Sequence, residues 1–220
     1  SIGGNELMLG LFIVSGVQLS HLVTTVIVRK IYKQKKEYTY EFNKYLIIAC
    51  VFPIFLIVIS ALLLSLSGIP YIQTEFKGTI LIVAILTTFV GAYTEEIGWR
   101  GCLLHIIETE YTPFVSSIFV GMLWAIWHFF KISSVGIVGF LLFIPTIIML
   151  SILMSYIFHK SNKSLVNMVV FHSFFNLTNI FLIYNREGKA FYIALLGVQI
   201  VVLFFIFLND RNYFKLKTNQ

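Results

Sequence analysis

Long runs of apolar residues alternate along this chain with short polar connections. A run of about 20 mostly apolar residues is long enough to cross a bilayer as a helix. By this criterion we predict about seven membrane-spanning helices. Their expected bounds are Leu7–Val28, Tyr45–Ser67, Gly78–Glu108, Pro113–Phe130, Ile137–Phe158, Ser164–Tyr184 and Ala190–Leu208. The third run is too long for one simple crossing.

Composition supports a membrane protein rather than a soluble one. The 220 residues are 58% hydrophobic and only 12% charged, with a mean hydropathy of +0.89. This charged fraction is about half of that in soluble domains. Because the connections are too short to hold a soluble domain, we expect one domain over residues 1–220. The predicted fold class is an all-α, polytopic membrane helical bundle.

The distribution of basic residues predicts how the bundle is oriented. The first connection is the most basic, with Arg29, Lys30, Lys33, Lys35, Lys36 and Lys44. The positive-inside rule places this loop in the cytoplasm, so the N-terminus is expected outside and the C-terminus in the cytoplasm. The net charge of +6 is then explained by contact with anionic headgroups of the lipid bilayer. We expect no nucleic-acid partner, since the basic loop is short and flanked by spans.

Three ionisable residues interrupt the third apolar run: Glu95, Glu96 and Arg100. An ionisable group inside a membrane indicates a functional site, because burying it there is costly. Glu96 and Arg100 are four residues apart and can pair on one helix face, whereas Glu95 projects about 100° away. A buried ion-pair network that fixes helix packing is the alternative. One arginine, however, neutralises only one of the two carboxylates.

Two further apolar runs each carry a histidine, His128 and His172. Trp124 precedes His128 by four residues and Asn176 follows His172 by four, so each pair shares a helix face. An amide at this spacing can fix the imidazole tautomer or contact a substrate carbonyl. The alternative is interhelical hydrogen bonding, a common use of such residues in membranes.

Missing motifs narrow the chemistry that these residues can support. The sequence has no HExxH zinc motif and no GxSxG nucleophile motif. Its single aspartate, Asp210, lies in the polar tail, which excludes a two-aspartate intramembrane protease. The remaining hydrolytic option is a site built from glutamate and histidine.

The ordered motifs resemble those of a known family. Glu95 to Arg100 matches EExxxR, Trp124 to His128 looks like FxxxH with Trp in place of Phe, and His172 to Asn176 matches HxxxN. Together they resemble the CAAX-protease and bacteriocin-processing family, also called CPBP or Abi, which is related to the type II prenyl-protein protease. The resemblance covers a motif-bearing core of about residues 78–184.

The resemblance implies a role for each matching residue. Glu95 would be the catalytic base that activates water for peptide hydrolysis, supported by Glu96 and Arg100. His128 and His172 would bind a metal or polarise the carbonyl, and Asn176 would help to hold the oxyanion.

The sequence is compatible with two roles for the histidines, one with a metal and one without. Glu95, His128 and His172 could supply three ligands to Zn²⁺ and leave one position open, as catalytic zinc sites do. Equally, His128 and Asn176 could stabilise the oxyanion without a metal.

From the residues and the resemblance we predict an intramembrane endopeptidase that cleaves a peptide or a membrane-associated protein. Bacterial family members are associated with bacteriocin immunity or maturation of secreted peptides. The composition, rich in Lys, Ile, Phe and Asn, favours an AT-rich bacterial genome and hence a substrate that is not prenylated. One rival is a non-proteolytic membrane scaffold of the same family that binds a partner membrane or cell-envelope protein. A small transporter is the other, but the chain lacks an inverted repeat.

Overall fold

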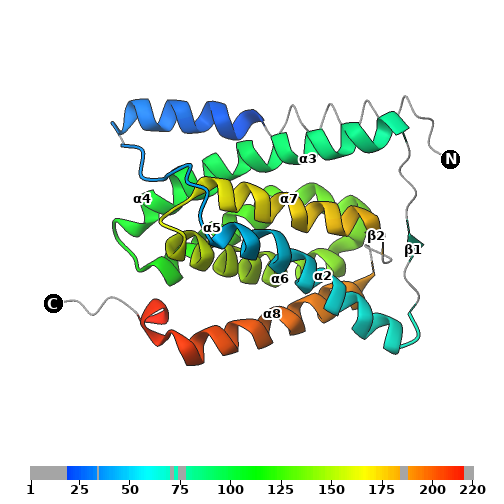
Figure 1. Ribbon diagram of the computed structural model, residues 1–220. Helices are drawn as coiled ribbons and strands as arrows, with labels where there is room; N and C mark the ends of the chain where they lie inside the picture. The colour runs from blue at the N-terminus through cyan, green and yellow to red at the C-terminus, as the bar shows by residue number, and fades with distance from the viewer. Residues whose placement is uncertain (1–18, 34, 70–71, 74–77, 184–187, 216–220) are drawn as a thin grey trace.

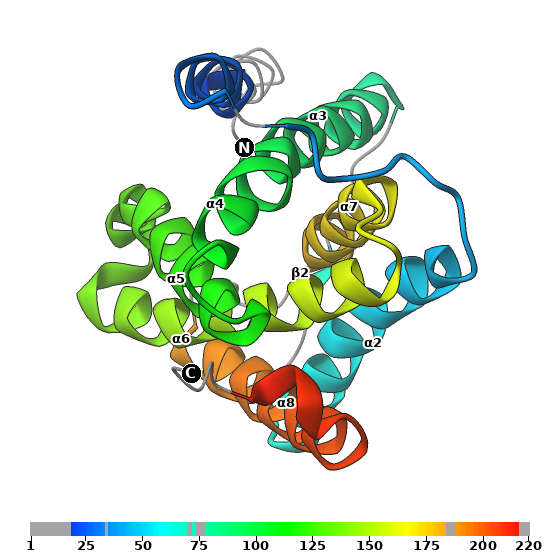
Figure 2. The same cartoon turned by 90° about the vertical axis from the view of Figure 1, so that its left-hand side faces the viewer.

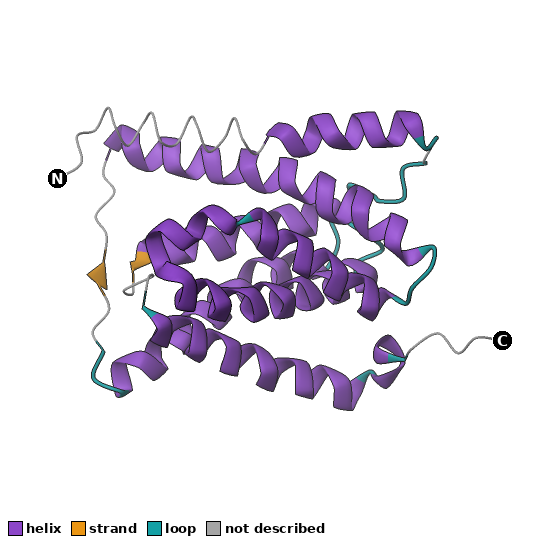
Figure 3. Ribbon diagram, turned by 180° about the vertical axis from the view of Figure 1, so that it is seen from behind, coloured by secondary structure: helices purple, strands orange, loops and turns teal. Residues whose placement is uncertain are grey.

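The chain folds into a bundle of helices, as Figures 1 and 3 show. The computed structural model describes residues 19–33, 35–69, 72–73, 78–183 and 188–215. Within these ranges, the sheet structure is limited to a two-residue antiparallel pair, β1 (Ile72–Gln73) with β2 (Leu182–Ile183), and an isolated bridge between Thr39 and Ser164. The prediction of an all-α fold is confirmed.

The helices follow one another with short connections. The first described helix covers residues 19–31. The later ones are α2 (Tyr45–Leu66), α3 (Gly78–Gly98), α4 (Leu104–Glu108), α5 (Pro113–Trp127), α6 (Ile132–Lys160), α7 (Leu165–Phe181) and α8 (Lys189–Asn209). Short 3₁₀ turns precede α6 at Phe129–Lys131 and follow α8 at Arg211–Phe214.

Not all of the predicted spans are of full membrane-crossing length. Among the described residues, four helical segments are long and apolar enough to cross a membrane: Tyr45–Leu66, Leu81–Glu108, Phe129–Lys160 and Lys189–Asn209. Helices α5 and α7 are apolar but shorter, with 15 and 17 residues. Most of the predicted span Leu7–Val28 lies outside the described residues. Six of the predicted spans therefore correspond to described helices, and two of those six are short.

The over-long third run is a single continuous helix with one irregular stretch. Between α3 and α4 the backbone is π-helical over Trp99–Leu103. A π-turn inside an α-helix often marks a functional site. Here it begins three residues after Glu96 and contains Arg100, so the irregular backbone lies at the predicted site.

The helices pack in a closed order around the bundle. Helix α7 packs on α3 and α2, α8 packs on α2 and α6, and α5 joins α6 to α4 and the π-helical segment. Figure 2 views this arrangement from the end of the bundle at which the described C-terminal residues lie. Helices α3, α5 and α7, which carry the three motifs, are thereby brought close together.

Small residues allow α5 and α6 to approach closely. A Cβ atom on Gly121 would lie 2.7 Å from the Cα of Ile148. Nearby, the Ser151 hydroxyl donates a 2.9 Å hydrogen bond to the Ser117 carbonyl. Close contact through small residues and interhelical hydrogen bonds is how membrane helices associate.

Polar contacts join several connections at one end of the bundle. Glu37 in the first connection pairs with Lys163, in the connection from α6 to α7, at 3.2 Å. Lys160 at the end of α6 pairs with Asp210, which follows α8, at 2.6 Å. The connections after the first described helix and after α6, and the residues after α8, therefore lie at the same end of the molecule (Figure 1).

Candidate active site

The long helix α3–π–α4 supplies three buried ionisable side chains. Glu95, Glu96 and Arg100 are 3%, 0% and 1% exposed. Arg100 Nη1 donates to Glu96 Oε1 at 2.8 Å and to Oε2 at 3.0 Å. The pair predicted from the four-residue spacing is present, and it is fully enclosed by protein.

Glu96 also has a partner on α7. His172 Nδ1 lies 2.9 Å from Glu96 Oε1, and His172 is itself 4% exposed. Because a carboxylate accepts, Nδ1 carries the proton of this hydrogen bond, and ring atom Nε2 faces away from Glu96. Glu96 thus receives donors from two helices, and it fixes the orientation of the imidazole.

Glu95 faces α5 instead. The indole Nε1 of Trp124 donates a hydrogen bond to Glu95 Oε2 at 3.1 Å. The two neighbouring glutamates therefore have different partners, as their separation of about 100° on the helix predicts.

The ring of Trp124 touches the other members of the site. The Arg100 guanidinium carbon lies 4.8 Å from the ring centroid of Trp124, a cation–π contact. The His172 ring is 5.2 Å away, edge to face. Residues from α3, the π-helical segment, α5 and α7 thus meet around one side chain.

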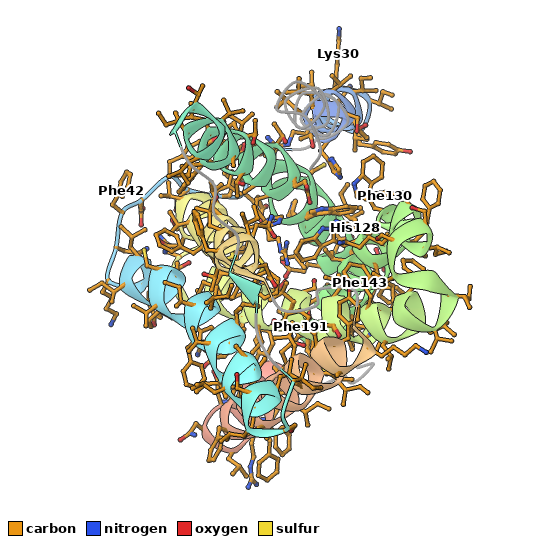
Figure 4. The ribbon with its side chains drawn as sticks, turned by 90° about the vertical axis from the view of Figure 1, so that its right-hand side faces the viewer. Lys30, Phe42, His128, Phe130, Phe143 and Phe191 are labelled. Atoms are coloured by element: carbon orange, nitrogen blue, oxygen red, sulfur yellow. The ribbon has the colours of Figure 1, made fainter. Side chains whose placement is uncertain are left out.

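His128 ends α5 and is partly exposed. Its Nδ1 lies 2.8 Å from the carbonyl of Trp124. Since a carbonyl only accepts, Nδ1 carries the proton, and Nε2 of the neutral ring is the atom left to accept one. The ring packs beside Phe130 and Phe143, at centroid distances of 5.6 and 5.5 Å, and Figure 4 labels all three.

Asn176 lies one turn after His172 on α7 and is partly exposed. Its spacing places the amide on the same helix face as the imidazole. The structure therefore joins Glu96, Arg100 and His172 through direct hydrogen bonds, and Trp124 connects Glu95 to this group. It links His128 to them through Trp124, and it places Asn176 beside them along α7.

Sequence reasoning did not assign a role to Trp124. The usable signal was its residue type, because tryptophan has a ring N–H donor that phenylalanine lacks. Trp124 begins the FxxxH-like motif on α5, and its ring N–H donates to the acceptor that the neighbouring helix presents, which is Glu95.

The residues predicted as zinc ligands do not form a metal-binding group in this arrangement. Throughout the described ranges, no three His, Cys, Asp or Glu side chains are grouped so as to hold a metal ion. Glu96 holds His172 through Nδ1, and Trp124 holds both Glu95 and His128.

The backbone of the π-helical segment is held from outside by the first part of the chain. Arg29 Nη2 donates to the carbonyl of Gly101 at 2.5 Å. A Cβ atom on Gly101 would lie 3.0 Å from the Tyr38 ring, and one on Gly98 would lie 3.2 Å from His21. The two glycines thus let the first described helix and the basic connection pack directly against the segment that carries Arg100.

A cavity of about 270 Å³ lies on this outer side. It is formed by the first described helix, the π-helical segment and the end of α5, with Trp99, Cys102 and Trp127 among its lining residues. None of the six predicted site residues lines it. The cavity is therefore separate from the carboxylate cluster.

Comparison with known proteins agrees with the motif analysis. Residues 77–178 match the family described as "Type II CAAX prenyl endopeptidase Rce1-like", and all six predicted site residues fall within the match. The chain is 27% identical over 228 residues to CAAX prenyl protease 2 of Methanococcus maripaludis, which covers 93% of this chain and 83% of that protein. It is also 24% identical over 136 residues to Lysostaphin resistance protein A of Staphylococcus haemolyticus, covering 60% of this chain and 37% of that protein.

Proposed function

Because the motif-bearing core of this chain is of the Rce1-like CAAX prenyl endopeptidase family, we propose that the protein is an intramembrane endopeptidase that cleaves by a glutamate-activated water. The proposal is supported by one observation: Glu95, Arg100 and His172 all contact the buried side chain of Trp124. Uncompensated charge is costly in a membrane, so such groups are retained where they serve a function.

Glu95 is the general base in this proposal. It takes a proton from water while the water oxygen attacks the carbonyl carbon of the scissile peptide bond. The carbonyl oxygen becomes an oxyanion in the tetrahedral intermediate. When the C–N bond breaks, the proton held by Glu95 passes to the leaving nitrogen. The products are an amine and a carboxylic acid, which then loses its remaining proton to water.

The remaining residues support this step. Arg100 balances the charge of Glu96, and Glu96 in turn orients His172. We assign His128, His172 and Asn176 to the oxyanion side, because preorganised donors there stabilise charge that develops in the transition state. The Asn176 amide donates directly, whereas each imidazole would donate through Nε2 in its doubly protonated form, since Nδ1 already donates to Trp124 or Glu96.

The substrate is a peptide or a membrane-associated protein. The name of the methanococcal relative refers to a prenylated substrate, so a prenylated C-terminal peptide is one candidate. An unmodified secreted peptide, as in bacteriocin immunity or peptide maturation, is the other. A pair of otherwise identical peptides, with and without the prenyl group, separates the two when offered to the protein in liposomes.

Glu95→Gln is the decisive variant, since it keeps the size and hydrogen-bonding capacity of the side chain but removes the base. We expect cleavage to fall at least about 100-fold with unchanged yield. Glu110→Gln is the matched control, because Glu110 is exposed in the turn before α5. Cleavage by Glu95→Gln at the wild-type rate would refute the base and favour the non-proteolytic scaffold.

Metal analysis of the purified protein tests the alternative in which His128 and His172 are zinc ligands. The proposed mechanism requires cleavage to persist after removal of bound metal by a chelator. Stoichiometric zinc, lost together with activity and restored with it, would replace this mechanism by one in which Glu95, His128 and His172 rearrange into a ligand set.

A further inference from the structure

A hydrogen bond joins Trp124 on α5 to Glu95, the proposed base. The donor is the indole Nε1 and the acceptor is Glu95 Oε2, at 3.1 Å. Trp124 is 2% exposed and Glu95 is 3% exposed, so water does not compete freely for this contact. A hydrogen bond to an ionised group is stronger than one between neutral groups, and burial strengthens it further.

Two other contacts hold the indole ring in place, and a third holds the backbone of Trp124. The Arg100 guanidinium lies over the ring at 4.8 Å and the His172 ring contacts it at 5.2 Å. The backbone carbonyl of Trp124 accepts from His128 at 2.8 Å. The indole N–H is therefore a fixed donor whose position depends on the same residues that surround the base.

We propose that Trp124 is a positioning residue for the reaction, whose indole N–H holds the Glu95 carboxylate in the orientation needed to take a proton from water. This inference rests on the proposed function, in which Glu95 is the base. Holding a reacting group within a fraction of an ångström of its working position contributes to the rate without a direct part in bond making.

Trp124→Phe tests this role. Phenylalanine keeps an aromatic ring against Arg100 and His172 but removes the donor. We expect kcat to fall about 10- to 100-fold, as for loss of one hydrogen bond to a charged group, while KM changes by less than about twofold because substrate-binding groups are retained. Incorporation of benzothienylalanine, which replaces the ring N–H by sulfur, should reproduce the loss in a side chain of nearly the same shape.

Trp127→Phe is the matched control. Trp127 lies three residues further along the same helix and its ring contacts His21 at 4.6 Å rather than either glutamate. Its loss should leave kcat within about twofold of wild type. If Trp124→Phe and Trp127→Phe cleave alike at the wild-type rate while Glu95→Gln is inactive, the positioning role is refuted and the proposed function stands.

A spectroscopic measurement tests the contact independently of cleavage. The ultraviolet resonance Raman difference between wild type and Trp124→Phe isolates the signal of this indole, including the band that responds to N–H hydrogen bonding. We expect that band to report a weaker hydrogen bond in Glu95→Gln, because an amide oxygen is a poorer acceptor than a carboxylate. An unchanged band would overturn the inference even if the wild-type protein proves inactive on every peptide.

Discussion

His172 Nδ1 and Glu96 Oε1 are 2.9 Å apart in space, although 76 residues separate the two side chains in the sequence. This contact ties α7 to α3 beside the pair formed by Glu96 and Arg100. Glu96 is therefore the structural centre of the charged cluster, whereas Glu95 faces Trp124. In the proposed mechanism, Glu96 would therefore support the site, whereas Glu95 would act as the base.

Removal of Arg100 should destabilise the protein rather than act on catalysis alone. Arg100→Ala leaves Glu96 fully buried without its cation, at a cost of about 3–5 kcal/mol. We expect a lower yield and a lower thermal midpoint in detergent. Arg211→Ala, which removes an exposed arginine, is the control and should behave as wild type.

A second substitution tests the physical reason. In Glu96→Gln/Arg100→Ala the stranded charge is also removed, so part of the lost stability should return. If Arg100→Ala were as stable as Arg211→Ala, the ion pair would not contribute to folding.

The basic first connection is expected to face the cytoplasm. Lys35→Cys, in a background without Cys50 and Cys102, should resist an impermeant thiol reagent added to intact cells. Ser133→Cys lies at the opposite end of the bundle and is exposed at the start of α6, so it should be labelled. The reverse pattern would invert the orientation of the whole bundle.

The contact between α5 and α6 should be sensitive to a single methyl group. In Gly121→Ala the new Cβ would lie 2.7 Å from the Cα of Ile148, so the helices must separate, at a cost of about 1–3 kcal/mol. Gly197→Ala is the control, because its Cβ would meet nothing within 4 Å. Thermal unfolding in detergent should show a lower midpoint for the first variant only, and equal midpoints would contradict the close packing.

The pair of Asp210 and Lys160 should make a small, pH-dependent contribution to stability. The Lys160 ammonium holds the pKa of Asp210 below its ordinary value, chiefly through their hydrogen bond. Because the folded-state pKa is lowered, this contribution is present above the unfolded value of about 4 and is lost as the pH falls through the folded value.

Asp210→Asn isolates that contribution. At neutral pH its thermal midpoint should be slightly below that of wild type, by less than about 1 kcal/mol of stability, since the pair is partly exposed. The difference should disappear as the pH is lowered below about 4. Two curves that remain parallel throughout the titration would show that the ion pair does not stabilise the fold.

Local patterns predicted much of this structure, because they act between residues close in sequence. Apolar run length predicted the helices, and the four-residue spacing predicted the Glu96–Arg100 pair. The hydrogen bond between Glu96 and His172 could not be predicted from local spacing, because it depends on how α7 packs against α3. The shortness of α5 and α7 was also missed, since neighbouring apolar residues continued both runs beyond the ends of the helices.

The number of residues in the π-helical segment Trp99–Leu103 sets how α3 is rotated about the helix axis relative to α4. Each residue of an α-helix turns the following side chains by about 100°. Deleting one residue from this segment would therefore rotate α3 relative to α4 even if every named side chain were kept. The two glutamates would then face a different neighbour or the lipid. A one-residue deletion in this segment should therefore reduce folding and activity more than most point substitutions do.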